Sequence, residues 1–346
     1  MNNKDKFESI KKESVRSIFH TIAQNGSISR ADIAARVGLS LMTVGKVVDT
    51  LLERKIVMQE KESRTVAGRR AGLISLNRLY FSMVLDLTRK QFRMTVIDAM
   101  IETVDRIEYD YNPEYYYEEN LYIFLKNVKI YILRHLNMAQ CMGIGILVPG
   151  IYDKRADCVR GARSPELADI NLTQVVQDIL GEPVSIITDD IASAALSNAM
   201  HIESYTKKTV FYATLGDVIC GAVLQNGQQV FAPDGGNLGK MITRTGRHLE
   251  EYLSTFSLSS EQFAELSVAL YNLTWIINPD VIILENRKVL QNGELGEMLT
   301  LALRRLFSDK EKMPPQIVIA DPTVHHADIG IATAIRSAWI DRTLCS

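Results

Sequence analysis

The sequence predicts an α/β protein in two parts: a helical head with a short hairpin, then a larger body in which strands and helices alternate. The first 78 residues contain three segments with helical spacing of apolar residues. The net charge also changes sign after residue 78. Residues 1–78 carry 15 basic and 8 acidic residues, a net +7, and the remainder carries 24 basic and 33 acidic residues, a net −9. We therefore predict two domains, 1–78 and 79–346.

The three helices of the head can be placed from their ends and their apolar spacing. The first ends at Asn25–Gly26, and the second begins at Ser29, with Asp32 three residues later as in a capping box. The second ends at Gly38, and Ser40 is the predicted N-cap of the third. The apolar stripes of the first and third helices are Val15, Ile18, Phe19 and Ile22, then Val44, Val47, Val48, Leu51 and Leu52.

The spacing of the second and third helices is typical of a helix-turn-helix. Ala34 is small where two helices cross closely, and Gly38 falls in the tight turn, where glycine adopts a left-handed backbone at low cost. This pattern predicts DNA binding, because the third helix then presents its outer face to the major groove. The residues expected to contact DNA from that face are Ser40, Met42, Thr43, Gly45, Lys46 and Thr50. The alternative is a plain three-helix bundle with a charged hairpin.

A hairpin with a basic tip follows the helices. Its predicted strands are residues 56–59 and 73–76, and its tip spans residues 61–72. We expect the tip to act as a DNA-binding wing through Arg64, Arg69 and Arg70. Residues 27–77 resemble the N-terminal winged helix-turn-helix of the ROK family of repressors and sugar kinases, in its sugar-responsive repressor branch. The segment Gly68-Arg69-Arg70 followed by Leu-x-x-Leu-Asn is typical of that branch.

The body alternates predicted strands and helices, which indicates mixed sheets. The strands are predicted at 84–87, 94–98, 143–148, 185–187, 209–214, 221–224, 281–284 and 316–319, and the helices near 118–137, 172–180, 261–276 and 328–340. The resemblance to the ROK family covers nearly all of this body. It implies an actin-like, ribonuclease-H-like domain of two lobes, about 79–195 plus 327–346 and about 196–326, with a ligand cleft between them. It also implies a homodimer or a higher homo-oligomer.

The resemblance places the phosphate-binding turns of the kinases on residues that cannot form them. The first turn falls on residues 86–90, where both glycines of the family pattern are missing. The second falls on residues 216–221, where Asp217 and Val218 stand in the loop that would cradle an anion. The Gly-Gly on the adenosine side falls near Glu285–Asn286. We expect a pseudokinase with no catalytic residue and no ATP cofactor.

The family's zinc site is also missing from the sequence. The histidine of its Gly-Glu-x-Gly-His motif falls on Lys240, and the following residues, 241–248, contain no cysteine. A structural zinc site needs four ligands, and His248 is the only candidate in that segment. We therefore expect no metal, and we interpret His248 as a surface or half-buried histidine.

The resemblance implies that this sequence retains part of the family's sugar pocket. The general base of the kinases falls on Asp190, which could instead cap the helix beginning at Ile191, and a second carboxylate falls on Glu250. Without a placed phosphate and metal, a carboxylate here can bind a sugar hydroxyl without chemistry. The turn at Pro149–Gly150, with Gly145 before it, is expected to line the floor of the cleft.

Two substitutions make this pocket less negative than in the kinases. Asn237 and Lys240 replace a glutamate and a histidine of the family pattern, and an ammonium is a good partner for phosphate or carboxylate. We therefore expect an effector with a negative charge, such as a sugar phosphate or a sugar acid. Further cations nearby in the sequence are Arg160, Arg163, Arg244 and Arg247. The alternative is that all these cations form a solvated face.

Together these features predict a cytoplasmic DNA-binding regulator, a repressor of carbohydrate-metabolism genes with a sugar-derived effector. A ligand-independent regulator whose body dimerises or docks a partner, and an active sugar kinase with an accessory DNA-binding domain, are the alternatives. No run of eighteen apolar residues indicates a membrane span. The four cysteines lie far apart and form no CxxC pair, which favours reduced thiols over a disulfide framework.

Overall fold

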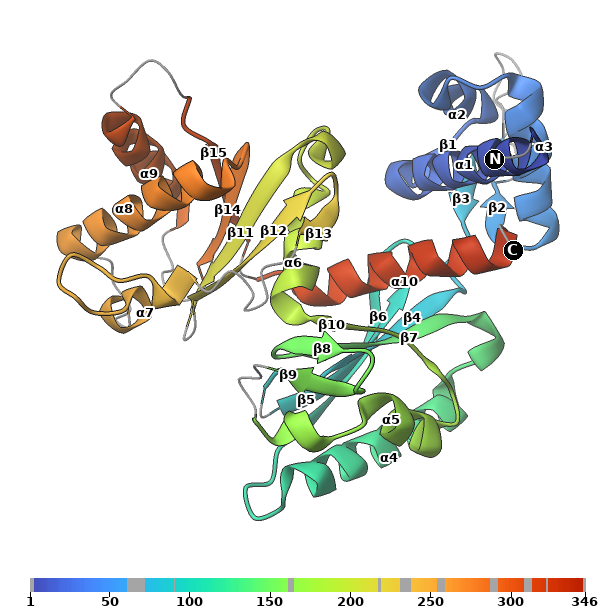
Figure 1. The fold of residues 1–346 in the computed structure, drawn as a ribbon. Coiled ribbons are helices and arrows are strands. Elements are labelled where there is room, and N and C mark those ends of the chain that lie inside the picture. Colours follow the sequence, from blue (N-terminus) through green and yellow to red (C-terminus); the bar gives the residue numbers. More distant parts are fainter. Residues whose placement is uncertain are drawn as a thin grey trace.

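The computed structural model describes residues 3–60, 72–89, 91–160, 165–216, 219–230, 238–253, 259–286, 292–307, 313–321 and 323–344. These residues form a helical head and two α/β lobes (Figure 1). Helix α10 (His326–Leu344) connects the three bodies, since lobe two lies at its N-terminal end and the head at its C-terminal end. The predicted fold class, a winged helix-turn-helix followed by a two-lobed α/β body, is confirmed.

The described part of the head contains three helices and a small antiparallel sheet of order β1-β3-β2. Its elements are α1 (Asn3–Asn25), β1 (Ser27–Ile28), α2 (Arg30–Val37), α3 (Leu41–Glu53), β2 (Val57–Gln59) and β3 (Ile74–Leu76). Gly38 adopts φ 67° at the end of α2, and its N–H donates to the Ala34 carbonyl, as the helix-turn-helix pattern requires. The predicted helices and hairpin strands are confirmed. Their core is formed by Ile18, Phe19, Ile22, Ile33, Val44, Val48, Leu51, Ile56 and Ile74.

Lobe one has a mixed five-stranded sheet of order β10-β7-β4-β5-β6, in which β10, β7 and β4 are parallel. Helices α4 and α5 pack on one face and α10 on the other. Its elements are β4 (Phe81–Asp86), β5 (Gln91–Asp98), β6 (Thr103–Asp110), α4 (Tyr117–His135), η1 (Met138–Gln140), β7 (Cys141–Val148), β8 (Ile151–Asp153), β9 (Cys158–Arg160), η2 (Pro165–Asp169), α5 (Leu172–Leu180) and β10 (Val184–Asp189).

Lobe two repeats the same topology, with sheet order β13-β12-β11-β14-β15 and parallel β11, β14 and β15. Helices α8 and α9 cover one face, and α6 from the end of lobe one covers the other. Its elements are α6 (Asp190–Ala199), η3 (Tyr205–Lys207), β11 (Thr209–Leu215), β12 (Ile219–Gln225), β13 (Gln228–Val230), η4 (Leu238–Lys240), α7 (Leu249–Tyr252), α8 (Ser260–Ile277), β14 (Val281–Asn286), α9 (Asn292–Leu306) and β15 (Gln316–Ala320).

Two helices, α6 and α10, cross where the chain passes between the lobes. A Cβ added at Gly330 of α10 would lie 1.9 Å from the carbonyl oxygen of Ser193 in α6, so the two backbones approach as closely as glycine allows. Ser193 Oγ donates to the Ala327 carbonyl at 2.6 Å. Gly145 of β7 packs closely against α10, because a Cβ added there would lie 2.6 Å from the side chain of Ile331. The expectation that Gly145 lines the cleft floor is therefore wrong.

The C-terminal half of α10 contacts the head. Asp341 forms an ion pair with Arg16 of α1 at 2.5 Å, and the Thr343 carbonyl accepts from Arg54, the C-cap residue of α3. Trp339 packs on Tyr80 with ring centroids 4.9 Å apart. Ile331 and Ile335 of α10 belong to the same buried cluster as the core of the head. Helix α10 therefore contacts α6 between the lobes, the sheet of lobe one, and the head.

Some elements were not predicted from the sequence. Strand β6 lies at the edge of its sheet with most of its side chains exposed or half-exposed, so it lacks the apolar run of a buried strand. Helix α9 buries only a narrow stripe, Leu295, Leu299 and Leu303. No helix among the described residues is long and apolar enough to cross a membrane.

Candidate DNA-binding surface and effector cleft

The N-terminus of α3 is fixed by its own cap. The Ser40 hydroxyl accepts from the Thr43 N–H at 3.1 Å, which satisfies one of the free donors of the first turn. Helix α2 is capped in the same way, because Ser29 Oγ accepts from the Asp32 N–H at 3.1 Å. Both caps agree with the sequence prediction. In the capped first turn of α3, Leu41, Met42 and Thr43 are exposed, whereas Val44 is buried in the core of the head.

The residues predicted to contact DNA lie on one exposed face of α3. Met42 is 73% exposed and the preceding Leu41 is 58% exposed. The remaining predicted residues on this face are exposed, except for the half-buried Gly45: Ser40, Thr43, Lys46 and Thr50. The opposite stripe of α3 is buried in the core of the head. This division is what a helix needs to enter the major groove without unfolding the domain.

The wing is described only where it joins the sheet. Strand β2 pairs with β3 in antiparallel register, Val57 opposite Leu76. The predicted wing residues Arg64, Arg69 and Arg70 lie outside the described residues. Their contact with DNA stays a prediction.

Asp190, which is predicted to contact the effector, lies at the first position of α6, directly after strand β10. The capping role belongs to its neighbour, because the Asp189 carboxylate accepts from the N–H groups of Ile191 at 2.9 Å and Ala192 at 3.1 Å. The helix-capping alternative for Asp190 is therefore wrong. Asp190 is itself buried, with 8% of its surface exposed. A carboxylate at the end of a parallel strand is well placed to meet a ligand hydroxyl.

Two other predicted ligand residues contact each other. The Lys240 ammonium donates to the Glu250 carboxylate, and this bond raises the pKa of Lys240. Gly239 permits the approach, since an added Cβ there would lie 2.8 Å from Glu250 Oε2. The fourth predicted ligand residue, Asn237, lies outside the described residues. The structure thus brings Lys240 and Glu250 together.

Two of the four other cations expected near the cleft are paired as well. Arg160 forms an ion pair with Asp153 at 2.6 Å. Arg244 forms one with Glu265 at 2.7 Å. Arg163 lies outside the described residues, and Arg247 is exposed. These pairs match the solvated-face alternative more closely than they match an anion site.

A buried ion-pair network lies at the position that the resemblance assigns to the first phosphate-binding turn of the kinases. Asp86 accepts from Thr88 Oγ1 at 2.6 Å and from Arg93 Nη2 at 2.7 Å. The same Nη2 donates to Asp328 of α10 at 3.0 Å, and Thr95 Oγ1 donates to the second oxygen of Asp328. Burial raises the pKa of Asp328, although Arg93 opposes that rise. One guanidinium therefore bridges two carboxylates at this position.

This network was missed by the sequence reasoning, although its signal was present. Asp86 and Arg93 are partners in the β4–β5 hairpin register. Counting back from a tight turn would have placed them opposite each other on the same face of the sheet. Asp328 could not be found in this way, because it comes from α10, more than two hundred residues later.

Gly221, which the resemblance places in the second phosphate loop of the kinases, has a structural role here. Gly221 lies inside β12 opposite Ala213, and a Cβ added there would meet the Phe211 ring at 2.6 Å. This glycine serves packing within the sheet. The substituted residues Asp217 and Val218 lie outside the described residues. On the adenosine side, Glu285 is buried at the end of β14 and accepts from the Tyr212 hydroxyl.

His248 is the N-cap residue of α7, and its Nδ1 lies 3.0 Å from the Lys240 carbonyl, which can only accept. Among the described residues, no group of three or more His, Cys, Asp or Glu side chains is placed to hold a metal ion. His248 therefore has a local structural contact.

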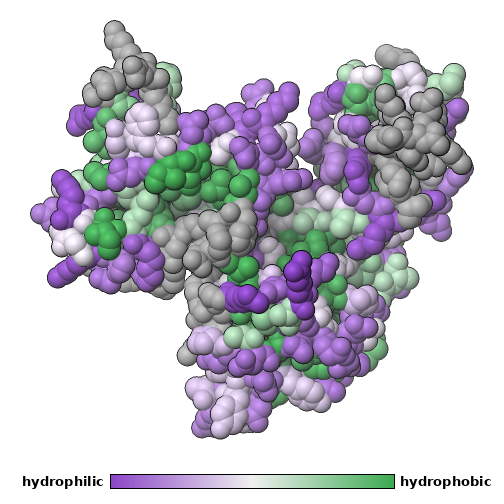
Figure 2. All heavy atoms as spheres, in the orientation of Figure 1, coloured by the Kyte–Doolittle hydropathy of each residue, from purple (hydrophilic) through white to green (hydrophobic). Residues whose placement is uncertain are grey.

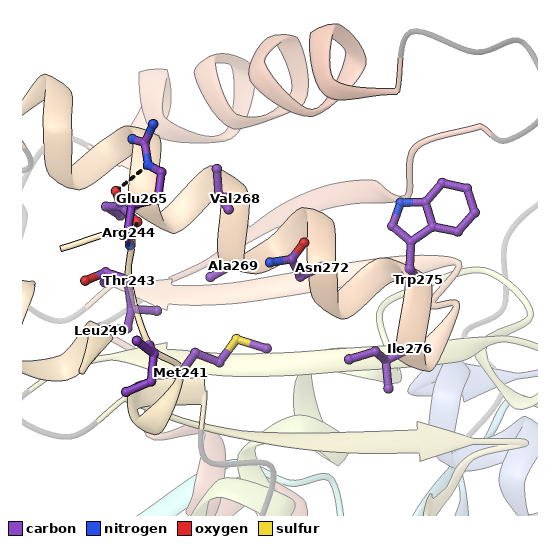
Figure 3. Close-up of a pocket in the computed structure, with 11 residues that line it drawn as sticks. Met241, Thr243, Arg244, Leu249, Glu265, Val268, Ala269, Asn272, Trp275 and Ile276 are labelled. Atoms are coloured by element: carbon purple, nitrogen blue, oxygen red, sulfur yellow. Dashed lines mark hydrogen bonds and ion pairs between the residues drawn. The ribbon is translucent and has the colours of Figure 1, made fainter. Parts of the chain in front are cut away.

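A groove of about 660 Å³ on the outer side of lobe two was also missed. Helix α8 and the segment before α7 form its walls, with the Arg244–Glu265 ion pair at one end (Figure 3). Three large apolar side chains along it are exposed: Ile242, Trp275 and Ile276. Apolar residues also gather on lobe two in the space-filling view (Figure 2). The sequence could have indicated this groove, because the segment of α8 has apolar residues on more than one helix face, and one such face stays exposed.

Comparison with known families agrees with the fold. Residues 82–245 match the model of the ROK family, and residues 12–58 match that of the winged helix-turn-helix DNA-binding domain. The body is thus a two-lobed domain of the sugar-kinase type fused to a DNA-binding head. This chain carries a ROK family domain behind a winged helix-turn-helix domain.

Individual relatives are distant. The xylose repressor of Bacillus spizizenii is 24% identical over 230 residues, which cover 63% of this chain and 56% of the relative. The xylose repressor of Bacillus subtilis is 27% identical over 197 residues, 54% of this chain and 48% of the relative. The chain thus spans about half the length of the curated relatives it matches.

Solved structures share the fold over a longer span. A ROK family transcriptional regulator, a homolog of the Escherichia coli MLC protein, superposes with a TM-score of 0.69 at 14% identity, covering 97% of this chain and 99% of that chain. The ROK hexokinase of Thermus thermophilus gives 0.55 at 17% identity, with 76% and 99% covered. Both the head and the body therefore have known folds.

Proposed function

We propose that the chain is a DNA-binding transcriptional repressor whose ROK body responds to a sugar-derived effector. The observation that carries the proposal is the exposed outer face of the capped helix α3, on a head held by α10 of a sugar-kinase-like body. The relatives named xylose repressor support a sugar as the effector class.

The connection between body and head runs along α10. Its first turns contact α6 close to Asp190, and its last turn contacts Arg54 at the end of α3. A change in the angle between the lobes displaces the first contact, and the continuous helix carries that displacement to the second. Effector binding in the cleft thereby changes how the head sits on DNA. Two heads act together in a homodimer or a higher homo-oligomer.

We propose in addition that the body has no kinase activity. Phosphoryl transfer depends on a placed phosphate and metal. Arg93 supports this proposal, because its guanidinium lies beside Asp86, at the position of the kinase phosphate turn, and forms an ion pair with that carboxylate. Asp190 and Glu250 then bind effector hydroxyls without catalysis.

The ligand-independent regulator is a second candidate with an observation in its favour. Lys240 and Glu250 satisfy each other, so this part of the pocket is complete without an effector. An anionic effector has to displace Glu250 from Lys240 before it can bind the ammonium. A neutral sugar has no such competition.

The test begins with an operator selected by the full-length protein from a random duplex pool. Operator affinity is then measured with D-xylose, N-acetylglucosamine, glucose and glucose 6-phosphate. We expect at least one of them to change the affinity in the wild type but not in Asp190→Asn, while Asp178→Asn, an exposed carboxylate on α5, responds normally. Specific DNA binding that none of the sugars affects would favour the ligand-independent regulator.

A further inference from the structure

The outer face of α3 has few hydrogen-bonding groups free for the bases. Thr50 Oγ1 donates to the Lys46 carbonyl at 3.0 Å, within the helix itself. Thr43 Oγ1 lies 2.9 Å from Ser40 Oγ, the hydroxyl that caps the helix. The hydroxyls of these two threonines are therefore occupied locally, and each threonine also carries a methyl group.

The charged groups of this face are also accounted for. Asp49 forms an ion pair with Arg30 of α2 at 2.8 Å, which ties the two helices together. Glu53 lies at the C-terminal end of α3, away from the turn that enters the groove in helix-turn-helix complexes. Lys46 is a single exposed ammonium, suited to a phosphate or to one acceptor on a guanine.

The composition of α3 removes the usual means of direct readout. Bidentate recognition of purines uses Arg or Lys for guanine and Asn or Gln for adenine. The helix, residues 41–53, contains no Arg, Asn or Gln, which leaves Lys46 as its one side chain of these types. The two most exposed large side chains of its first turn are instead apolar, Leu41 at 58% and Met42 at 73%.

Apolar side chains can distinguish bases in one way in the major groove. The C5-methyl group of thymine is the apolar mark on a base edge there, and it is absent from cytosine, adenine and guanine. Gly45 adds to this geometry, because a position without a side chain on the same face lets the helix backbone approach the groove closely.

We propose that Leu41 and Met42 read thymine methyl groups in the major groove, so that α3 selects its operator by methyl contact instead of bidentate hydrogen bonding. The inference rests on the proposed DNA-binding function. It assigns specificity to two apolar side chains, and it leaves Lys46 to strengthen binding with little dependence on base sequence.

The test removes single methyl groups from the DNA. In the operator selected by the full-length protein, each thymine is replaced in turn by deoxyuridine, which keeps the Watson–Crick edge and lacks only the methyl. We expect one or two positions in each half-site at which wild-type affinity falls by about fourfold, the factor for burial of one methyl-sized group. Leu41→Ala or Met42→Ala should bind the thymine operator more weakly and should lose the sensitivity to deoxyuridine at its own position.

The matched control is Leu133→Ala, which removes a 77% exposed leucine from α4 in the body. It should keep the full deoxyuridine sensitivity of the wild type. The proposal is overturned if deoxyuridine has no effect at any position, or if the variants of α3 keep the wild-type sensitivity. Failure to select any preferred sequence would instead contradict the DNA-binding function itself, so the two failures are distinguishable.

Discussion

Replacing Arg93 by methionine should destabilise lobe one far more than an ordinary ion-pair mutation. Arg93 bridges two buried carboxylates, and the side chains of Asp86 and Asp328 are 8% and 3% exposed. Removal of the guanidinium leaves both carboxylates without their shared cation. Breaking a buried pair from one side costs about 3–5 kcal/mol. At 2–4 °C per kcal/mol for a domain of 150–250 residues, we expect the melting temperature to fall by roughly 6–20 °C.

The loss should depend on pH in a defined direction. Burial raises the pKa of Asp328, and Arg93 is the group that opposes this rise. Without Arg93 the folded-state pKa rises further above its ordinary value, so the folded state is penalised as pH increases from about 4 through the raised pKa. The difference between Arg93→Met and the wild type should therefore be largest at neutral pH and should shrink as the pH approaches 4.

Calorimetry or urea unfolding at pH 7.5 and pH 5 measures both effects. Arg160→Met is the control, since it breaks an Arg–Asp pair in the same lobe whose arginine side chain is 67% exposed. An exposed pair contributes about 0–1 kcal/mol, so this variant should melt close to the wild type at either pH. Asp328→Asn combined with Arg93→Met should recover part of the loss. Equal, pH-independent shifts in the two arginine variants would refute the reasoning.

Two further predictions concern the head and the cleft. Lys46→Ala combined with Arg69→Ala and Arg70→Ala should weaken operator binding, and each lost phosphate contact should lower the slope of log affinity against log salt by about 0.9; an unchanged slope in a normally folded protein would place the DNA-binding surface elsewhere. Lys240→Met should abolish the response of operator affinity to an anionic effector and leave affinity without effector unchanged, whereas a normal response to a neutral sugar would contradict the charge argument.

The local signals of the sequence predicted the head well. Caps and turns are set by a few neighbouring residues, so Ser29, Gly38 and Ser40 could be assigned their roles before the structure was known. Strands of the body with continuous apolar runs were found for the same reason. Strand β6 was not, because an edge strand exposes polar side chains along most of its length.

The cleft could be predicted only in part, because its contacts are long-range. The Asp86 position was identified by resemblance, but its partner Arg93 follows from hairpin register, and Asp328 follows only from the path of α10. Lys240 and Glu250 were both chosen as ligand residues, yet their mutual ion pair depends on how η4 packs on α7. Sequence spacing gives the residue types of such a site, whereas the fold decides which of them neutralise each other.

The same pairing bears on the proposal that this body has no kinase activity. A buried carboxylate without a partner costs several kcal/mol, so replacing the glycines alone would leave the acidic positions unbalanced. In this chain these carboxylates have partners: Asp86 shares Arg93 with Asp328, Glu285 accepts from the Tyr212 hydroxyl, and the half-buried Glu250 pairs with Lys240. Because the partners are side chains of the protein, this part of the cleft is balanced without a nucleotide. The effector then has to gain its affinity by exchanging these internal contacts for its own, which favours a ligand rich in hydroxyl groups.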